Sequence, residues 1–305
     1  MTEALIDVKS LQKSYGDFTA LESINFEVME GEIFGLLGPN GAGKTTTLES
    51  LEGLRAPDSG TMRVAGIDPT RDPYKLKNVI GVQLQSSGLP ENITPDEAMK
   101  FFCAYHGVTP RFDLLQRLGL GEKRTAQFYE LSTGQQRRLA IALAVAHEPT
   151  VLFLDEPTAG LDVASRVELH EMMREFRSKG MTIILATHDM AEAEEMSDRV
   201  AILLNGRIAA TGTPMEITAK GSGLTKVSVR TKHACLTQDD IKLPGESQRL
   251  TKDDYLILFS TNISITLSAI IRMIEAEEDT LIDLRVERPT LEDRFLEITK
   301  NGEEN

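Results

Sequence analysis

The chain has 305 residues, and at ~150 residues per domain this length predicts two domains. Its formal net charge of −14 argues against nucleic acid as a partner, because phosphate backbones are bound through basic surfaces. Cys103 and Cys235 form no C-x-x-C pair, which is typical of reduced thiols in a cytosolic protein. The first residues lack the basic and apolar segments of a leader, and the longest apolar run, residues 139–146, is too short to span a bilayer. We therefore expect a cytoplasmic chain.

Strand-like alternation opens the chain at residues 4–9 and 21–29. Tyr15 lies between these segments, next to a glycine. Its ring can either stack on an adenine face or pack in a turn, and the residues around it do not decide between the two.

A glycine-rich stretch at residues 38–46 fits the pattern G-x-x-x-x-G-K-[ST] of loops that cradle nucleotide phosphates. A short apolar strand precedes it at 32–37, and a helix is predicted over 45–54. A helix that starts here points its free N–H groups at the polyanion. The alternative, a glycine-rich turn that matches by chance, has no use for this strand–loop–helix order. The residues that we expect to bind the nucleotide are Gly38, Pro39, Asn40, Gly41, Ala42, Gly43, Lys44, Thr45 and Thr46.

Each residue type in this loop has a physical role. Glycine permits positive φ and lets the backbone approach the phosphates without an obstructing Cβ. Lys44 would reach the β- and γ-phosphate oxygens, and the Thr45 hydroxyl would coordinate Mg²⁺. Thr46 would add a donor near the α-phosphate.

Helices and strands alternate over the next 150 residues. Strands are predicted at 61–66 and 79–82, and Thr94 begins a helix with proline at its first position and glutamate at its third. We expect a helical region from there to about residue 130. Ser132 and Gln135 have capping-box spacing at the start of a helix that ends near residue 146. Further elements are expected at 151–154 (strand), 162–178 (helix), 181–186 (strand), from 189 (helix), and at 200–204 and 207–211 (hairpin).

Two of these strands end in residues suited to phosphate chemistry. Asp155 follows the apolar strand 151–154 and can hold Mg²⁺ from the side opposite Thr45. Glu156 is then placed to orient and polarise an attacking water. His188 ends the next apolar strand and can reach the same crevice to contact the γ-phosphate. The alternative for Asp155 and Glu156 is a pair of carboxylates that face solvent, and the alternative for His188 is an ordinary surface histidine.

The composition changes near residue 220. Strands are expected at 225–230, 255–259 and 280–286, with helices at 262–275 and from Pro289 onward. This pattern predicts a small α+β unit without phosphate chemistry.

These motifs, taken together, resemble the nucleotide-binding subunit of an ATP-binding-cassette (ABC) transporter over about residues 4–215. Residues 131–135, Leu-Ser-Thr-Gly-Gln, are similar to the family signature Leu-Ser-Gly-Gly-Gln. Within the resemblance, Tyr15 is the adenine-stacking aromatic and His188 is the switch histidine. Gln85 belongs to the loop that couples to the membrane subunit and to the Mg²⁺ site. Gln83 is the competing candidate, but residues 80–82 align with the strand that precedes the coupling glutamine.

The resemblance implies a P-loop NTPase fold, α/β, with a RecA-like core, an antiparallel β subdomain and an inserted helical subdomain at about 88–150. It implies an ATPase domain over 1–217 and an accessory α+β domain over 218–305. It also implies ATP and Mg²⁺ as cofactors and a head-to-tail homodimer, in which Ser132, Gly134 and Gln135 of one copy cap the γ-phosphate held by the other. Thr133 departs from the signature, because a Cβ intrudes where the backbone meets phosphate.

Residues 286–296 resemble the ending of ATPases of the ABC-2 exporter class, which includes drug and antibiotic exporters. That class implies an ATPase that powers export through a separate membrane permease and lies on the inner face of the cell membrane. The alternative is an ABC ATPase that acts on nucleic acid or ribosomes. A degenerate regulatory module fits poorly with the intact Lys44, Glu156 and His188, and a GTPase fits poorly because no Asn-Lys-x-Asp motif is present.

Overall fold

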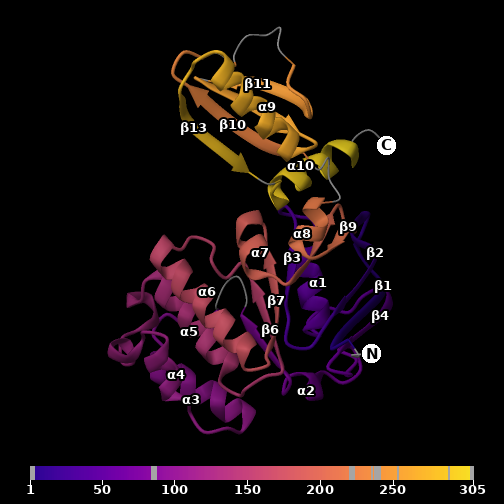
Figure 1. Ribbon diagram of the computed structural model, residues 1–305. Coiled ribbons are helices and arrows are strands. Elements are labelled where there is room, and N and C mark those ends of the chain that lie inside the picture. The colour runs from indigo at the N-terminus through magenta and orange to yellow at the C-terminus, as the bar shows by residue number, and fades with distance from the viewer. Residues whose placement is uncertain are drawn as a thin grey trace. The chain divides into compact units, whose positions relative to one another are not determined.

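The computed structural model describes residues 4–83, 88–219, 224–234, 236, 242–252, 254–287 and 289–302. The chain divides into two compact units, Met1–Pro214 and Met215–Asn305, and each is described by itself. Figure 1 shows the first unit in indigo to red and the second in orange to yellow.

A six-stranded sheet forms the centre of the first unit, with strand order β5-β6-β7-β3-β8-β9. Its first five strands run parallel and the last is antiparallel. All residues of β3, β6 and β7 are buried, as expected for parallel strands covered on both faces. The strands are β3 (Ile33–Leu37), β5 (Ile80–Gln83), β6 (Val151–Asp155), β7 (Thr182–Thr187), β8 (Arg199–Leu204) and β9 (Arg207–Gly212).

Successive side chains along these strands point to opposite faces of the sheet, so that a separate core forms on each face. Leu152 and Leu185 face one core, which they share with the long helices α3, α5 and α6. Phe153 and Ile184 face the other core, which they share with α1 and a second sheet. The helices of this unit are α1 (Lys44–Leu51), α2 (Pro73–Leu76), α3 (Pro95–His106), α4 (Phe112–Arg117), α5 (Thr133–Val145), α6 (Val163–Ser178) and α7 (Met190–Met196).

The second sheet of this unit is antiparallel, with order β2-β1-β4. Its strands are β1 (Ile6–Tyr15), β2 (Phe18–Val28) and β4 (Ser59–Val64). β1 is longer than the strand predicted at 4–9, because register shifts let it continue past Val8. Tyr15 therefore ends a strand beside a tight hairpin.

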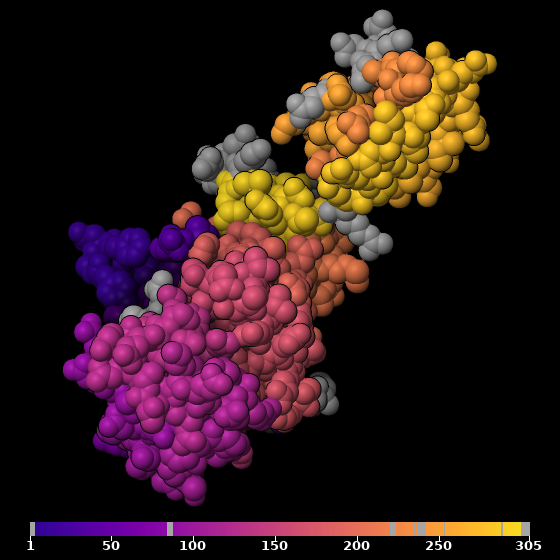
Figure 2. Space-filling model, turned by 90° about the vertical axis from the view of Figure 1, so that its left-hand side faces the viewer, coloured from indigo at the N-terminus to yellow at the C-terminus, as the bar shows by residue number. Residues whose placement is uncertain are grey.

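Helix starts agree with the capping signals, and α6 ends at Ser178 as predicted, whereas α1 and α3 end earlier than predicted. Thr94 accepts a hydrogen bond from the Glu97 N–H and completes a capping box at α3. α1 ends at Leu51 rather than at Leu54, because Gly53 turns the chain with φ 74°. The helical region predicted to continue to residue 130 breaks at Gly107, φ 70°, and continues as α4 and two short 3₁₀ turns. Figure 2 shows this region in magenta as one continuous part of the surface.

The second unit is a four-stranded antiparallel sheet, order β11-β12-β10-β13, with α9 packed on one face. β11 was not predicted, because its alternating polar residues resemble a loop. The elements are α8 (Pro214–Ala219), β10 (Thr225–Thr231), β11 (Glu246–Lys252), β12 (Tyr255–Ser260), α9 (Ile263–Ala276), β13 (Leu281–Glu287) and α10 (Leu291–Gly302). None of the helices in the described part of the chain is both long and apolar enough to cross a membrane.

Candidate nucleotide site

The phosphate loop connects β3 to α1, as predicted. Gly41 and Gly43 have φ of 81° and 107°, which favours glycine at both positions. Gly38 does not adopt positive φ. It is a glycine for a steric reason, since a Cβ there would lie 2.3 Å from the Leu203 carbonyl oxygen of β8. The loop is therefore held tightly against the end of the sheet.

Lys44, the first residue of α1, is buried beneath this loop. Its Nζ donates to the Gly38 carbonyl at 2.7 Å and to the Pro39 carbonyl at 3.2 Å. The ammonium group is also 3.6 Å from Glu156 Oε1. Burial lowers the pKa of Lys44, and the nearby Glu156 and Asp155 charges oppose that shift. The cation lies where it can meet phosphate oxygens.

Thr45 and Asp155 come together although they are 110 residues apart, because β6 ends beside the start of α1. The Thr45 hydroxyl donates to Asp155 Oδ2 at 3.1 Å. Burial raises the pKa of Asp155, and the Thr45 hydrogen bond works against that rise. A hydroxyl and a carboxylate are hard oxygen donors of the kind that Mg²⁺ prefers. The described residues contain no group of three or more His, Cys, Asp or Glu side chains able to hold a metal.

Glu156 and His188 form the second pair of the site. Glu156 Oε2 is 2.8 Å from His188 Nδ1, and Glu156 Oε1 is buried without a hydrogen-bond partner. The Glu156 backbone is in the left-handed region, φ 48°, while its N–H donates to the Ala186 carbonyl of β7. Such a conformation is uncommon for a residue with a side chain. His188 is 55% exposed, so it can reach a ligand above the sheet edge.

A pocket of about 200 Å³ is lined by Lys44, Thr45, Asp155 and Glu156, whereas His188, Gly38 and Ala42 are not among its lining residues. Tyr15 lies at its rim, 40% exposed, with the Arg55 guanidinium 5.1 Å from its ring centroid. Phe18 also lines the pocket and was not predicted, although its place directly after the hairpin turn was a usable signal. The other lining residues are Ala20, Pro39, Asn40, Gly41, Gly43 and Thr46.

Glu52 and Arg137 are further charged residues near the site that sequence reasoning missed. Glu52 follows α1, and burial raises its pKa to about 8, with the Asp155 and Glu49 charges adding to the rise. Arg137 of α5 is half-buried close enough to feel the Asp155 and Glu156 charges, and burial lowers its pKa. Neither residue belongs to a motif, so only the fold reveals them.

The signature residues lie elsewhere on the first unit. Ser132 caps α5 by accepting from the Gln135 N–H at 3.3 Å, and Gln135 Oε1 accepts from the Ser132 N–H at 3.0 Å. A Cβ on Gly134 would lie 2.9 Å from Ser165 Oγ of α6, so helix packing requires glycine there. None of these residues lines the pocket of the phosphate loop. Gln85, the predicted coupling glutamine and Mg²⁺ ligand, lies outside the described residues.

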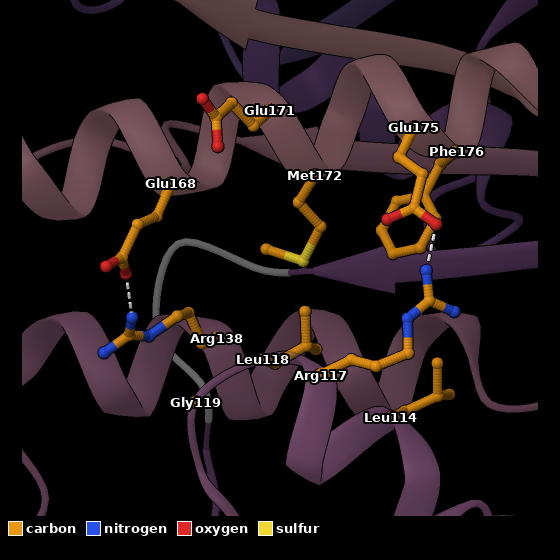
Figure 3. A pocket seen from close by; sticks show the side chains of 10 residues that line it. All are labelled: Leu114, Arg117, Leu118, Gly119, Arg138, Glu168, Glu171, Met172, Glu175 and Phe176. Atoms are coloured by element: carbon orange, nitrogen blue, oxygen red, sulfur yellow. Dashed lines mark hydrogen bonds and ion pairs between the residues drawn. The ribbon is translucent and has the colours of Figure 1, made fainter.

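A separate pocket of about 360 Å³ lies between α4, α5 and α6. Figure 3 shows Met172 and Phe176 of α6 above Leu118, with an Arg–Glu ion pair toward each end. These pairs are Arg138–Glu168 and Arg117–Glu175. It shares no lining residue with the phosphate-loop pocket, so it is not part of the nucleotide site.

Comparisons with known proteins point to one family. The ABC transporter family model matches residues 21–159. "Nod factor export ATP-binding protein I" of Paraburkholderia xenovorans (strain LB400) is 39% identical over 75% of this chain and 77% of its own length. "Daunorubicin resistance ATP-binding protein DrrA3" of Streptomyces coeruleorubidus is 32% identical over 98% of this chain and 97% of its own. "Probable multidrug ABC transporter ATP-binding protein YbhF" of Escherichia coli (strain K12) is 38% identical over 72% of this chain, which spans 39% of that relative.

Solved structures give the same result. A structure described as the "ATP binding subunit of ABC transporter" superposes with a TM-score of 0.66 at 31% identity, over 71% of this chain and 92% of that chain. The structure of cbiO1 from Clostridium perfringens, part of the ABC transporter complex cbiONQ, superposes with a TM-score of 0.64 at 32% identity, over 72% and 92%. The P-loop ABC cassette fold predicted from sequence is confirmed. The chain belongs to the ABC transporter family, as an ATP-binding subunit that hydrolyses ATP.

Proposed function

We propose that the chain is the motor subunit of an ABC-2 type exporter, in which two copies close on ATP and drive a separate membrane permease. The observation that carries this proposal is one pocket lined by Lys44, the Thr45–Asp155 pair and Glu156, whose carboxylate also contacts His188. Export is supported by relatives named for Nod factor export, multidrug transport and daunorubicin resistance.

Each group has a separate role at the triphosphate. The loop N–H groups and Lys44 would hold the β- and γ-phosphates, and Tyr15 would stack on the adenine. Thr45 and Asp155 would hold Mg²⁺, with Gln85 as a further ligand; the ion supplies charge neutralisation at the phosphoryl oxygens. Glu156 accepts the proton of the attacking water, and His188 orients that carboxylate through its 2.8 Å contact and reaches the γ-phosphate.

The site also takes groups from a second copy. In the proposed head-to-tail homodimer, the start of α5 caps the γ-phosphate bound by the facing chain. Support comes from Ser132 and Thr133, which are exposed at that helix start and do not line their own chain's pocket. The positive end of a thirteen-residue helix favours an anion. Cleavage to ADP removes the bridging charge, so the dimer opens.

Coupling to the permease belongs to the loop of Gln85, and the inserted segment at about 88–150 is a further docking face. Phe101 and Tyr105 are exposed on α3, 66% and 59%, and exposed aromatic side chains favour a protein partner. Binding to the permease would place the chain on the inner face of the cell membrane, with residues 218–305 as an accessory domain. The acidic net charge disfavours nucleic acid as a partner.

Substitution of the proposed base tests this function. Glu156→Gln keeps the shape of the side chain but removes the proton acceptor, so steady-state ATP hydrolysis should fall about 10²–10⁴-fold. ATP binding should persist, and the variant should accumulate as a dimer with ATP and Mg²⁺ in sedimentation velocity. Glu122→Gln, on an exposed 3₁₀ turn, is the matched control and should hydrolyse ATP as the parent does. Parent-like hydrolysis by Glu156→Gln would refute the role of Glu156, and a monomer with ATP would refute the dimer.

A further inference from the structure

β13 is an edge strand of the C-terminal sheet. Among the described residues it pairs with β10 on one side and with no strand on the other. Figure 1 shows β13 at the margin of this sheet, away from β11. An edge strand presents a row of backbone N–H and C=O groups that can pair with another chain.

The side chains of the two sheet edges differ. β13 exposes the apolar side chains of Leu281, Ile282 and Val286, at 42%, 51% and 45%. The opposite edge, β11, exposes a single large apolar side chain, Leu250, among mostly polar neighbours. Polar and charged residues are the usual protection of a sheet edge against pairing, and in β13 the charged residues Asp283, Arg285 and Glu287 alternate with apolar ones.

The two faces of β13 have different chemistry. Leu284 packs into the core beneath α9, and Ile282 and Val286 alternate onto that same face. Asp283 and Arg285 lie on the opposite face, where Asp283 accepts a hydrogen bond from Tyr255 at 2.7 Å. Arg285 is 2.9 Å from the same carboxylate and 63% exposed.

This order of residues makes the strand complementary to itself in one antiparallel register. With Leu284 opposite its own copy, Asp283 faces the second chain's Arg285, and this happens twice because of the twofold axis. The apolar pair Ile282–Val286 also forms twice. If the twofold axis moves to residue 283, Asp283 lies opposite its own copy. If it moves to residue 285, Arg285 lies opposite its own copy. Like charges directly opposite one another destabilise the pairing of two strands.

We propose that β13 pairs antiparallel with β13 of a second copy, centred on Leu284, and joins the two C-terminal sheets into one. The apolar layer beneath α9 then continues across the joint through Ile282 and Val286, while Asp283 and Arg285 close a ring of four alternating charges on the other face. This contact uses no residue of the nucleotide site and forms without ATP. It would keep two cassettes together between turnovers, which raises the effective concentration at which the nucleotide-driven contact reforms.

Sedimentation velocity of the full chain without nucleotide tests the proposal. The parent should dimerise, and Arg285→Glu or Asp283→Arg alone should each raise the dimer dissociation constant about tenfold or more, since each places like charges opposite twice. An equimolar mixture of the two variants should recover the parent's affinity, because the two carboxylates of the Arg285→Glu chain then face the two guanidinium groups of the Asp283→Arg chain. The matched control is Lys252→Glu on β11, which should leave the dimer unchanged.

The proposal is overturned if the nucleotide-free parent stays monomeric, if either single variant dimerises like the parent, or if mixing restores nothing. Cysteine cross-linking supplies a test that keeps the charges intact. Chains with Ile282→Cys and with Val286→Cys should form a covalent dimer when mixed and oxidised, above the level of each alone and of the parent, since these positions are directly opposite. Equal cross-linking with and without mixing would overturn the register. To separate the two contacts, the ATP-dependent dimer of Glu156→Gln is measured in the Arg285→Glu background, where a dimer seen only with ATP reports the nucleotide contact alone.

Discussion

Lys44 and Glu156 are the two charged side chains that join the phosphate loop to the end of β6. Their 3.6 Å separation couples the group that would bind the γ-phosphate to the group that would accept the water's proton. Both are buried, so each depends on the other for compensation of its charge. A change at one position therefore alters the electrostatics of the whole pocket.

The substitution Lys44→Ala tests whether the phosphate loop binds ATP through this side chain. The substitution removes charge-assisted hydrogen bonds to phosphate, so ATP affinity should fall about 10–100-fold by calorimetric titration. Lys9→Ala, an exposed lysine paired with Asp7 on β1, is the control and should bind ATP like the parent. Unchanged affinity in Lys44→Ala would contradict the loop assignment.

Glu52 predicts a pH dependence of stability. Burial raises its pKa to about 8 in the folded chain, above the ordinary 4.5. The folded state therefore binds the proton more tightly, and the stabilisation is complete below pH 4.5 and decreases as pH rises toward 8. One such group changes the free energy of unfolding by at most about 1.4 kcal/mol per pH unit.

Glu52→Gln should flatten that decrease in urea denaturation measured from acid to neutral pH, because the amide carries no titrating proton. Glu122→Gln should leave the slope unchanged. A slope in Glu52→Gln that equals the parent's would show that Glu52 does not carry the effect.

Helix starts and helix ends are controlled by different residues in this protein. Starts are marked by side chains that accept the first free N–H groups, as at Thr94, Ser132 and Asp162. The ends of α1 and α3 depend on glycines in the left-handed region, Gly53 and Gly107. A cap is recognisable from three or four residues. A glycine inside an apolar segment does not by itself reveal whether the chain turns there.

Thr94→Ala tests the cap of α3. Loss of the side-chain acceptor should lower the free energy of unfolding of the first unit by about 1 kcal/mol, measured by chemical denaturation. Thr94→Asp keeps an acceptor oxygen for the Glu97 N–H and should retain most of the stability. Equal loss in both variants would mean that the hydroxyl acts in some way other than as a cap.

At the scale of the whole molecule, the nucleotide pocket is built within one unit. Every residue that lines it lies between Tyr15 and Glu156, and the C-terminal unit has its own core beneath α9. Two units with separate cores can fold separately.

Removal of residues 218–305 should therefore leave ATP affinity within about threefold of the parent, the ordinary spread of small context effects. Calorimetric titration measures the affinity, and circular dichroism verifies that the shortened chain is folded. A folded chain that no longer binds ATP would contradict the separation of the units.

The amino-acid sequence is enough to predict the parts that depend on neighbours along the chain. These are the phosphate loop, the apolar strands with Asp155 and His188 near their ends, the caps at Thr94 and Ser132, and the Asn205-Gly206 hairpin. These parts can be predicted from a few neighbouring residues, because the hydrogen bonds that close a turn or a helix cap join residues only a few positions apart.

Which of these parts meet depends on the order of the strands in the folded chain. The order β5-β6-β7-β3-β8-β9 brings Asp155 to Thr45, and the adjacency of β6 and β7 brings Glu156 to His188. The burial of Glu52 and the open edge of β13 likewise follow from packing and strand order. The local pattern of apolar residues predicts a buried strand but not which strand lies beside it. The neighbouring strand determines which side chains come within contact distance, how deeply they are buried and which charges they meet.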